Sequence, residues 1–312
     1  MAPPRPFRFG LQARGASSGR EWLELARRAE GLGYSSLTMP DHFDDQWAIG
    51  PALGAAAAVT TTLRLGSLVY GVDYRHPAVL AKEAATLDVL SDGRLELGLG
   101  AGWMAADYEQ AGIALDGAGT RIERMVEYLA VLRELWRGEP VDHDGRHVTV
   151  RGLTGHPVPV QEHGPPVLIG GGGPRMLRTA ARHADIVGVN FDLRGGSIGP
   201  ELGADAGAAR VDEKVGWVRE AADQRVDDIE LHLRVFVAAI TDDARGMAEA
   251  LAGGFGLTAD EALETPYALV GTVEEVCETL IARRERWGFS YIAFGPEVME
   301  DFAPVVARLS GT

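Results

Sequence analysis

The pair Asp41-His42 is the first place along the chain where the residue types suggest chemistry. It follows Ser35–Met39, a short run that predicts a β-strand. An imidazole at a strand end can accept or release a proton near neutral pH, so His42 is a candidate general acid or base. The alternative is a structural histidine that bonds to Asp41 or to a turn carbonyl. The spacing of His42, His76 and His183 matches no metal-binding motif, and no metal is expected.

Four consecutive glycines, Gly170, Gly171, Gly172 and Gly173, lead from an apolar run into a proline that suits the first turn of a helix. Glycine lets the backbone approach a ligand closely, and the N-terminus of a helix presents N–H groups to an anion. Arg175 would add a charge-assisted contact. The segment predicts a phosphate-binding turn, although a simple flexible turn has a similar composition. It is not a P-loop, because the Lys-Ser/Thr pair of that motif is absent.

Gly98, Gly100 and Gly102 occupy alternate positions directly before Trp103. Because side chains alternate between the two faces of a strand, these glycines would leave one face bare, and a flat ligand could lie against the backbone there. Trp103 and Tyr108 follow as candidate ligand contacts, although aromatic residues of this kind usually serve in packing.

Short apolar or β-branched runs alternate with helical patterns from one end of the chain to the other. The runs predict eight strands, at Phe7–Gln12, Ser35–Met39, Leu63–Val72, Leu95–Leu99, Pro166–Ile169, Ile186–Val189, Ile229–Ala239 and Tyr291–Phe294. The helical patterns lie at Ser18–Leu32, Pro51–Thr60, Pro77–Leu90, Arg121–Trp136, Arg175–His183, Ala209–Gln224, Val273–Trp287 and Met299–Leu309. This alternation predicts an α/β fold, a (β/α)8 TIM barrel with insertions, formed by residues 1–312 as a single domain.

The insertions are expected at Gly152–Pro166 and Gly195–Gly207, which are rich in glycine and proline. The alternative fold is a doubly wound sheet, whose glycine-rich dinucleotide turn should follow the first strand. Here Ala13–Ser17 occupies that place and lacks the spacing. In a barrel the active site lies at the carboxyl ends of the strands, which is where His42 and the four glycines are predicted to be.

Composition limits the possible functions. The 312 residues carry a net charge of −15, whereas a nucleic-acid binder normally shows a basic face. No stretch approaches the roughly 20 apolar residues that a membrane helix needs, and Met1–Phe7 lacks the apolar segment of a secretory signal. Cys277 is the only cysteine, which excludes an intrachain disulfide. We expect a cytoplasmic protein that acts on a small molecule, with no nucleic-acid or membrane partner.

Several motifs together resemble the bacterial luciferase-like family. They are Asp41-His42, the run Arg75–Pro77 opening a helix that continues through Ala85–Arg94, the stretch Leu97–Trp103, the Gly170–Gly173 turn and the helix Arg121–Trp136. The resemblance covers essentially the whole chain and is most specific over Arg75–Trp103. It implies a (β/α)8 barrel that binds FMN or the deazaflavin F420 at the carboxyl ends of its strands.

The resemblance favours F420, with FMN as the alternative cofactor. Asp41–Phe43 followed by Trp47 is similar to the F420-dependent branch of the family, and so is Val211–Ala222. FMN-using relatives commonly have Arg-Tyr where this chain has Arg121-Ile122, and an isoleucine cannot hydrogen-bond to a phosphate.

The resemblance also implies residue roles. His42 would handle a proton beside the cofactor ring. The implied cofactor contacts are Asp41, Ser67, Leu68, Val69, Gly100, Gly102, Gly170, Gly171, Gly172, Gly173 and Arg175. The candidate substrate contacts are Tyr70, Trp103, Tyr108, Asn190 and Phe191. The family further implies a non-prolyl cis peptide at Leu68–Val69.

The chain departs in one respect from the F420-dependent sugar-phosphate dehydrogenases that it resembles. Their acidic Glu after the Gly-x-Gly of the fourth strand is replaced by Trp103, so oxidation of glucose 6-phosphate is not expected. We expect hydride transfer between C5 of F420 and a small organic substrate, as in reduction of an activated C=C or C=N. The alternatives are an FMN-dependent monooxygenase and a flavin-binding protein without catalysis. Relatives usually form dimers, and Ala55–Ala58 offers small residues for close packing, so we expect a homodimer.

Overall fold

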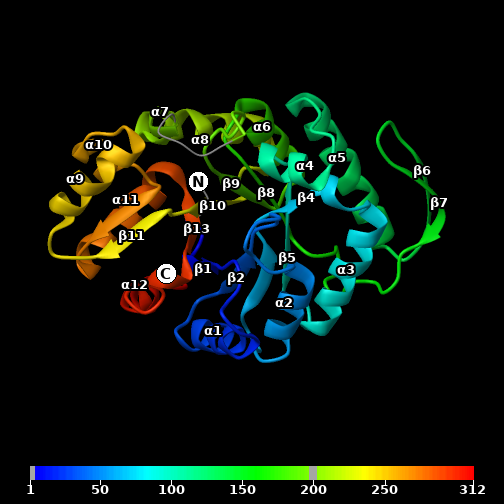
Figure 1. Cartoon of the computed structure of the whole chain (residues 1–312), viewed down its shortest axis with the longest axis horizontal. Helices are drawn as coiled ribbons and strands as arrows, with labels where there is room; N and C mark the ends of the chain where they lie inside the picture. Colours follow the sequence, from blue (N-terminus) through cyan, green and yellow to red (C-terminus); the bar gives the residue numbers. More distant parts are fainter. Residues whose placement is uncertain (1–3, 197–201) are drawn as a thin grey trace. The chain divides into compact units, whose positions relative to one another are not determined.

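The computed structural model describes residues 4–196 and 202–312 (Figure 1). Its chain divides into two compact units, which are described separately. The central unit comprises Arg14–Arg28 and Leu37–Ile169. The terminal unit comprises the chain up to Ala13 together with Ala29–Ser36 and Gly170–Thr312.

In the central unit, parallel strands alternate with helices. The strands that lie wholly or mainly in it are β2 (Ser36–Met39), β3 (Arg64–Ser67), β4 (Tyr70–Gly71), β5 (Leu95–Gly100) and β8 (Val167–Gly171), and β5 pairs in parallel with β3, β4 and β8. Its helices are α1 (Gly19–Gly31), α2 (Ile49–Ala57), α3 (Pro77–Leu90), α4 (Ala105–Ala111) and α5 (Ala118–Leu135), with the 3-10 turn η1 (Val72–Tyr74). An antiparallel hairpin, β6 (Pro140–Asp144) and β7 (Thr149–Thr154), projects beside α5 (Figure 1).

In the terminal unit, four parallel strands pair in the order β1 (Arg8–Gln12), β13 (Phe289–Phe294), β10 (Glu230–Arg234) and β9 (Ile186–Val189). A second parallel pair is formed by β11 (Val237–Ile240) and β12 (Ala268–Gly271). The helices are α6 (Pro174–His183), α7 (Gly203–Ala206), α8 (Ala208–Ala222), α9 (Ala244–Phe255), α10 (Ala259–Glu264), α11 (Val273–Trp287) and α12 (Ala303–Leu309), with the 3-10 turns η3 (Asp223–Arg225) and η4 (Pro296–Val298). Helices α6 and α8 lie side by side (Figure 1).

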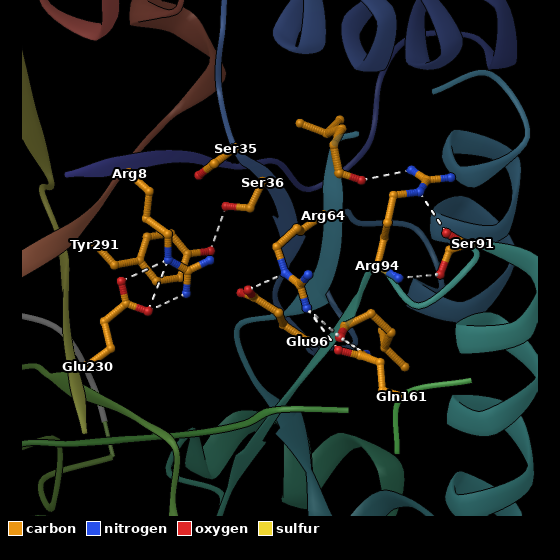
Figure 2. Close-up of polar contacts among 12 residues, drawn as sticks. Arg8, Ser35, Ser36, Arg64, Ser91, Arg94, Glu96, Gln161, Glu230 and Tyr291 are labelled. Carbon is orange, nitrogen blue, oxygen red and sulfur yellow. Dashed lines mark hydrogen bonds and ion pairs between the residues drawn. The ribbon is translucent and has the colours of Figure 1, made fainter. Parts of the chain in front are cut away.

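Polar residues share one face of β1 and β10 in the terminal unit. Side chains two positions apart lie on the same face of a strand, so Arg8 and Gln12 of β1 share a face, as do Glu230 and Arg234 of β10. At the amino ends, Arg8 donates to both carboxylate oxygens of Glu230 at 2.6–3.0 Å and lies over the ring of Tyr291 (Figure 2). At the carboxyl ends, Arg234 Nε donates to Gln12 Oε1 at 2.9 Å.

The central unit has its own buried polar cluster, also drawn in Figure 2. Arg64 Nε donates to Glu96 Oε1 at 2.5 Å, and Arg64 Nη2 donates to Gln161 Oε1 at 3.3 Å. Gln161 in turn donates to the buried carboxylate of Asp88 on α3 at 2.7 Å. This cluster ties the chain that follows the hairpin back to α3 and β5.

The predicted strands and helices are largely confirmed, with two strands interrupted. Leu63–Val72 forms β3 and β4, separated at Leu68–Val69 by the non-prolyl cis peptide that the family resemblance implied. Ile229–Ala239 forms β10 and β11, because the chain changes neighbours at its middle: Val235 N donates to Ala293 of β13, whereas Phe236 N donates to Tyr267 next to β12.

Other boundaries were wrong for local reasons. The predicted insertion Gly152–Pro166 begins inside β7, since the hairpin was not anticipated. The predicted helix Met299–Leu309 begins only at Ala303, where Pro304 suits the first turn. The predicted insertion Gly195–Gly207 lies partly outside the described residues, which resume before α7.

Candidate functional site

His42 is held in the central unit by a carboxylate that the sequence did not suggest. Its Nδ1 lies 2.6 Å from Asp107 Oδ2, in the first turn of α4, 65 positions along the chain. The same oxygen accepts from the Tyr74 hydroxyl at 3.2 Å, and Asp107 Oδ1 accepts from the backbone N–H of Phe43 at 3.3 Å. The Asp107 side chain is 4% exposed and that of His42 is 17% exposed, so the histidine is the accessible member of the pair.

This arrangement determines which nitrogen of His42 can act. A carboxylate can only accept, so Nδ1 carries a hydrogen and Nε2 is the nitrogen that can exchange a proton with a ligand. Burial and the adjacent Asp107 raise the pKa of Tyr74 well above its ordinary value, so Tyr74 remains a neutral donor to the carboxylate. The indole of Trp103 meets the imidazole edge-on, with ring centres 5.5 Å apart.

Asp41 makes no hydrogen bond to His42, so the first form of the structural alternative, a bond between these two neighbours, is not found. Its carboxylate accepts from Arg75 at 2.8 and 3.1 Å and from the backbone N–H of Gly71 at 3.0 Å. Arg75 also lies over the ring of Tyr70, 4.4 Å from its centre. Asp41 therefore fixes the end of β2 against β4 and the start of α3 in this structure.

The alternate glycines of β5 are needed for the close approach of the neighbouring strand. A Cβ on Gly98 would lie 2.0 Å from the carbonyl oxygen of Ser67, and one on Gly100 would lie 2.5 Å from a methyl group of Val69. Ser67 Oγ donates to the carbonyl of Gly98 and accepts from its N–H. The face that the sequence suggested was bare is thus covered by Ser67–Val69 at these two positions.

The aromatic candidates of the central unit differ in accessibility. Tyr70 and Tyr108 are buried, and the Tyr108 hydroxyl donates to Asp73 at 2.8 Å. A Cβ on Gly102, which has a positive φ of 76°, would lie 1.7 Å from that hydroxyl. Trp103 is half-buried and touches His42, so it is the aromatic candidate best placed to contact a ligand.

In the terminal unit the glycine turn leads into a helix as predicted. Gly173 is the N-cap of α6, it has no side-chain capping bond, and Pro174 occupies the first turn. A Cβ on Gly170 would meet only the carbonyl oxygen of Gly188, at 3.9 Å, whereas one on Gly172 would lie 2.1 Å from the carbonyl carbon of Phe191. A Cβ therefore has room at Gly170, whereas Gly172 is required by the backbone next to it.

The structure brings Asn190 and Phe191 against this turn. Asn190 N donates to the carbonyl of Gly171 at 2.9 Å, and Asn190 Oδ1 accepts from Phe191 N at 2.8 Å. The ring of Phe191 packs on Tyr267 and Phe236, with centres 4.3 and 5.1 Å away. The exposed side chain of Arg175 lies on the first turn of α6.

A buried ion pair supports the same segment. Lys214 Nζ, fully buried on α8, donates to Asp205 Oδ2 at 2.6 Å and to the carbonyl of Asn190 at 2.8 Å. The backbone N–H of Asp192 donates to the same Asp205 oxygen at 2.6 Å. Burial lowers the pKa of Lys214, and Asp205 opposes that effect. Periodicity could not reveal this network, because Lys214 occupies an ordinary position of an amphipathic helix.

Within residues 4–196 and 202–312, His, Cys, Asp and Glu side chains form no group of three or more that could hold a metal ion. In that same part of the chain, every helix is too short or too polar to cross a bilayer.

A solved structure shows which class of fold the chain has. The F420-dependent tetrahydromethanopterin reductase of Methanopyrus kandleri superposes with a TM-score of 0.76 over 98% of each chain, at 20% identity. The chain thus has the (β/α)8 TIM-barrel fold that its alternating elements predicted. The luciferase-like monooxygenase family matches residues 5–291, and the chain belongs to that family.

Several curated relatives with higher sequence identity share one name. The F420-dependent glucose-6-phosphate dehydrogenase of Nakamurella multipartita is 32% identical over 256 residues, which are 79% of this chain and 72% of the relative. The protein of the same name from Microbacterium testaceum is 34% identical over 189 residues, 58% of this chain. That match spans 55% of the Microbacterium protein, little more than half its length.

Proposed function

We propose that this protein is an F420-dependent oxidoreductase in which His42 exchanges the proton that accompanies hydride transfer. The observation that carries the proposal is the bond between His42 Nδ1 and the buried carboxylate of Asp107. It orients a half-buried imidazole and defines Nε2 as the proton-exchanging atom. The names of the curated relatives support F420 as the cofactor.

The residues present fit the parts of the cofactor. The uncapped N-terminus of α6 after Gly170–Gly173 offers backbone N–H groups to a phosphate, and Arg175 adds a positive charge. In the central unit, Asp41 and Ser67–Val69 are the proposed contacts of the ring. When bound, F420 gives or takes a hydride at C5.

The chain's own residues have separate tasks in this scheme. Asp107 holds the imidazole in one orientation, because its carboxylate accepts from Nδ1 and leaves Nε2 as the atom that faces a ligand. His42 Nε2 gives the proton to the substrate, or receives it from the substrate. Trp103 packs against the imidazole and shields that side of it from water.

The proposed reaction is reduction of an activated C=C or C=N in a small, largely apolar substrate. Trp103 stands where the sugar-phosphate dehydrogenases that the chain resembles have an acidic residue, so a second proton donor is absent from that position. Trp103, Asn190 and Phe191 remain proposed substrate contacts, whereas Tyr70 and Tyr108 are buried and are no longer proposed. A homodimer, a cytoplasmic location and a single domain over residues 1–312 also remain predictions.

A titration of the purified protein with F420 and with FMN tests the cofactor. We expect saturable binding of F420 and at least tenfold weaker binding of FMN. Tighter FMN binding, with oxygen consumed during turnover, would support the FMN-dependent monooxygenase instead. Binding of F420 without turnover of any activated alkene or imine would support a non-catalytic flavin-binding protein.

A further inference from the structure

Arg234 is a partly buried cation whose surroundings differ from those of Arg8, the other arginine on the same strand faces. Arg8 is paired with both oxygens of Glu230 at the amino ends of β1 and β10. Arg234 lies on the same face of β10 as Glu230, at the opposite end of the strand. It donates to the amide oxygen of Gln12 and to the carbonyl of Val235. Within residues 4–196 and 202–312, its Nη2 makes no hydrogen bond and no carboxylate forms an ion pair with it.

Arg283 shows how this chain satisfies a buried guanidinium for structure alone. It also lacks a carboxylate partner in the described part of the chain, but it donates to the carbonyls of Leu263, Thr265, Pro266 and Ala268. Burial lowers the pKa of Arg283 and of Arg234 alike, to about 10. Arg234 is partly exposed and has only two acceptors in the described part of the chain, both neutral, so neither a carboxylate nor a set of carbonyls compensates its charge there.

The position of Arg234 indicates what could compensate it. It is the last residue of β10, and Gln12 is the last residue of β1. In (β/α)8 barrels the carboxyl ends of the strands carry the ligand contacts, whereas the amino ends serve stability. The paired Arg8–Glu230 and the uncompensated Arg234 follow this division.

Aromatic rings lie next to Arg234. Its guanidinium is 5.5 Å from the ring centre of Phe236, which is 38% exposed and packs on Phe191 and Tyr267. The carboxylate of Glu297 acts on Arg234 only from beyond ion-pair distance. One cation beside exposed aromatic surface, with a carboxylate in the vicinity, suits a singly charged ligand with an apolar body better than a phosphate dianion.

We propose that Arg234 binds the carboxylate of an aromatic or otherwise apolar acid, which is the substrate or part of it. Arg234 Nη2 donates to the carboxylate, Gln12 holds the guanidinium in place through Nε, and Phe236 contacts the apolar body. This inference rests on the proposed function, since it names the substrate class of the same enzyme.

The test measures binding of benzoate, benzamide and inorganic phosphate to the F420-loaded protein by calorimetry. Benzoate and benzamide have the same shape and differ in charge, so their ratio reports the cation. We expect benzoate to bind about tenfold or more tightly than benzamide, as a charge-assisted pair requires. Arg234→Gln should abolish the preference, and Arg234→Lys should retain part of it. Arg245→Gln, which removes the same charge from the exposed surface of α9, should leave the preference unchanged.

Other results would overturn the inference. They are equal binding of benzoate and benzamide, no benzoate binding by the parent, an undiminished preference in Arg234→Gln, or phosphate binding more tightly than benzoate. The preference of the parent protein for benzoate over benzamide can be measured even if a variant fails to fold. F420 affinity is measured on the same samples without acid. Failure of the parent protein to bind F420 would refute the proposed function. A preference for benzoate that depends on Arg234 in the F420-free protein would still support the acid site.

Discussion

Replacing Asp107 by Asn separates the positioning of His42 from the binding of the cofactor. Asparagine has the shape of aspartate, but its amide N–H2 cannot accept from His42 Nδ1. Its oxygen can accept from Phe43 N, or it can take the place of Oδ2 and accept from Tyr74 and His42 Nδ1 as a neutral group. The imidazole loses its charged partner in both cases, and in the first it either rotates or moves its proton to Nε2, where it can no longer act as a base.

The size of the effect follows from the bond that is lost. A hydrogen bond to a charged group contributes roughly 1.5–3 kcal/mol, and each 1.4 kcal/mol corresponds to about a factor of ten. We therefore expect kcat to fall by roughly 10- to 100-fold in Asp107→Asn. That loss is smaller than the roughly 10²- to 10⁴-fold loss expected for His42→Asn, which removes the acid–base group itself. F420 affinity should change by less than threefold in both variants.

Asp73→Asn is the matched control for this experiment. Asp73 is also a buried carboxylate of the central unit, it accepts from Tyr108 and Arg124, and it has no bond to His42. Its replacement should lower the melting temperature while leaving kcat within about threefold of the parent. Equal losses of kcat in Asp107→Asn and Asp73→Asn, or normal turnover in Asp107→Asn, would refute the positioning role.

Three further predictions can be tested. Gly172→Ala places a Cβ against the backbone of Phe191 and should destabilise the protein by about 1–3 kcal/mol. Gly170→Ala should fold normally and weaken F420 binding. Equal melting temperatures of the two variants would contradict this difference. Burial lowers the pKa of His232 to about 3, so it is neutral when folded and takes up a proton on unfolding below pH 6.5. Its contribution to stability is present above that pH and lost as the pH falls, so from pH 7 to pH 5 the parent should lose about 2 kcal/mol more unfolding free energy than His232→Gln; parallel stability curves would exclude it. Light scattering should give twice the 33.3 kDa of one chain, and a monomer mass would rule out the homodimer.

The elements that could be predicted from the sequence are those with local patterns. Pro77–Leu90 begins with proline, keeps helical spacing and ends before Ser91 and Asp92, and α3 has those bounds. The division of Ile229–Ala239 could not be predicted, because Val235 and Phe236 are as apolar as their neighbours. What separates β10 from β11 there is a change of hydrogen-bonding partner, from β13 to the residue before β12.

The candidate site shows the same limit. His42 stood out because a titratable side chain follows a strand, but its partner Asp107 lies on another element and stands among ordinary helix-forming residues. The spacing of the alternate glycines of β5 predicted a bare face for a flat ligand, and this was wrong at Gly98 and Gly100. The atoms that fill the space beside Gly98 and Gly100 belong to Ser67 and Val69, and no pattern within β5 indicates them.

The contact between Gly172 and Phe191 has a mechanical consequence. It joins main chain to main chain, so no flexible side chain can absorb a displacement, and a shift of the glycine turn moves Phe191 with it. Phe191 packs in turn on Phe236, the ring beside Arg234. Phosphate binding at the turn and acid binding at Arg234 would therefore bias one another's equilibrium, and linkage makes the two influences equal in size. An engineer who reshapes Phe191 for a new substrate should expect the affinity for the cofactor to change as well.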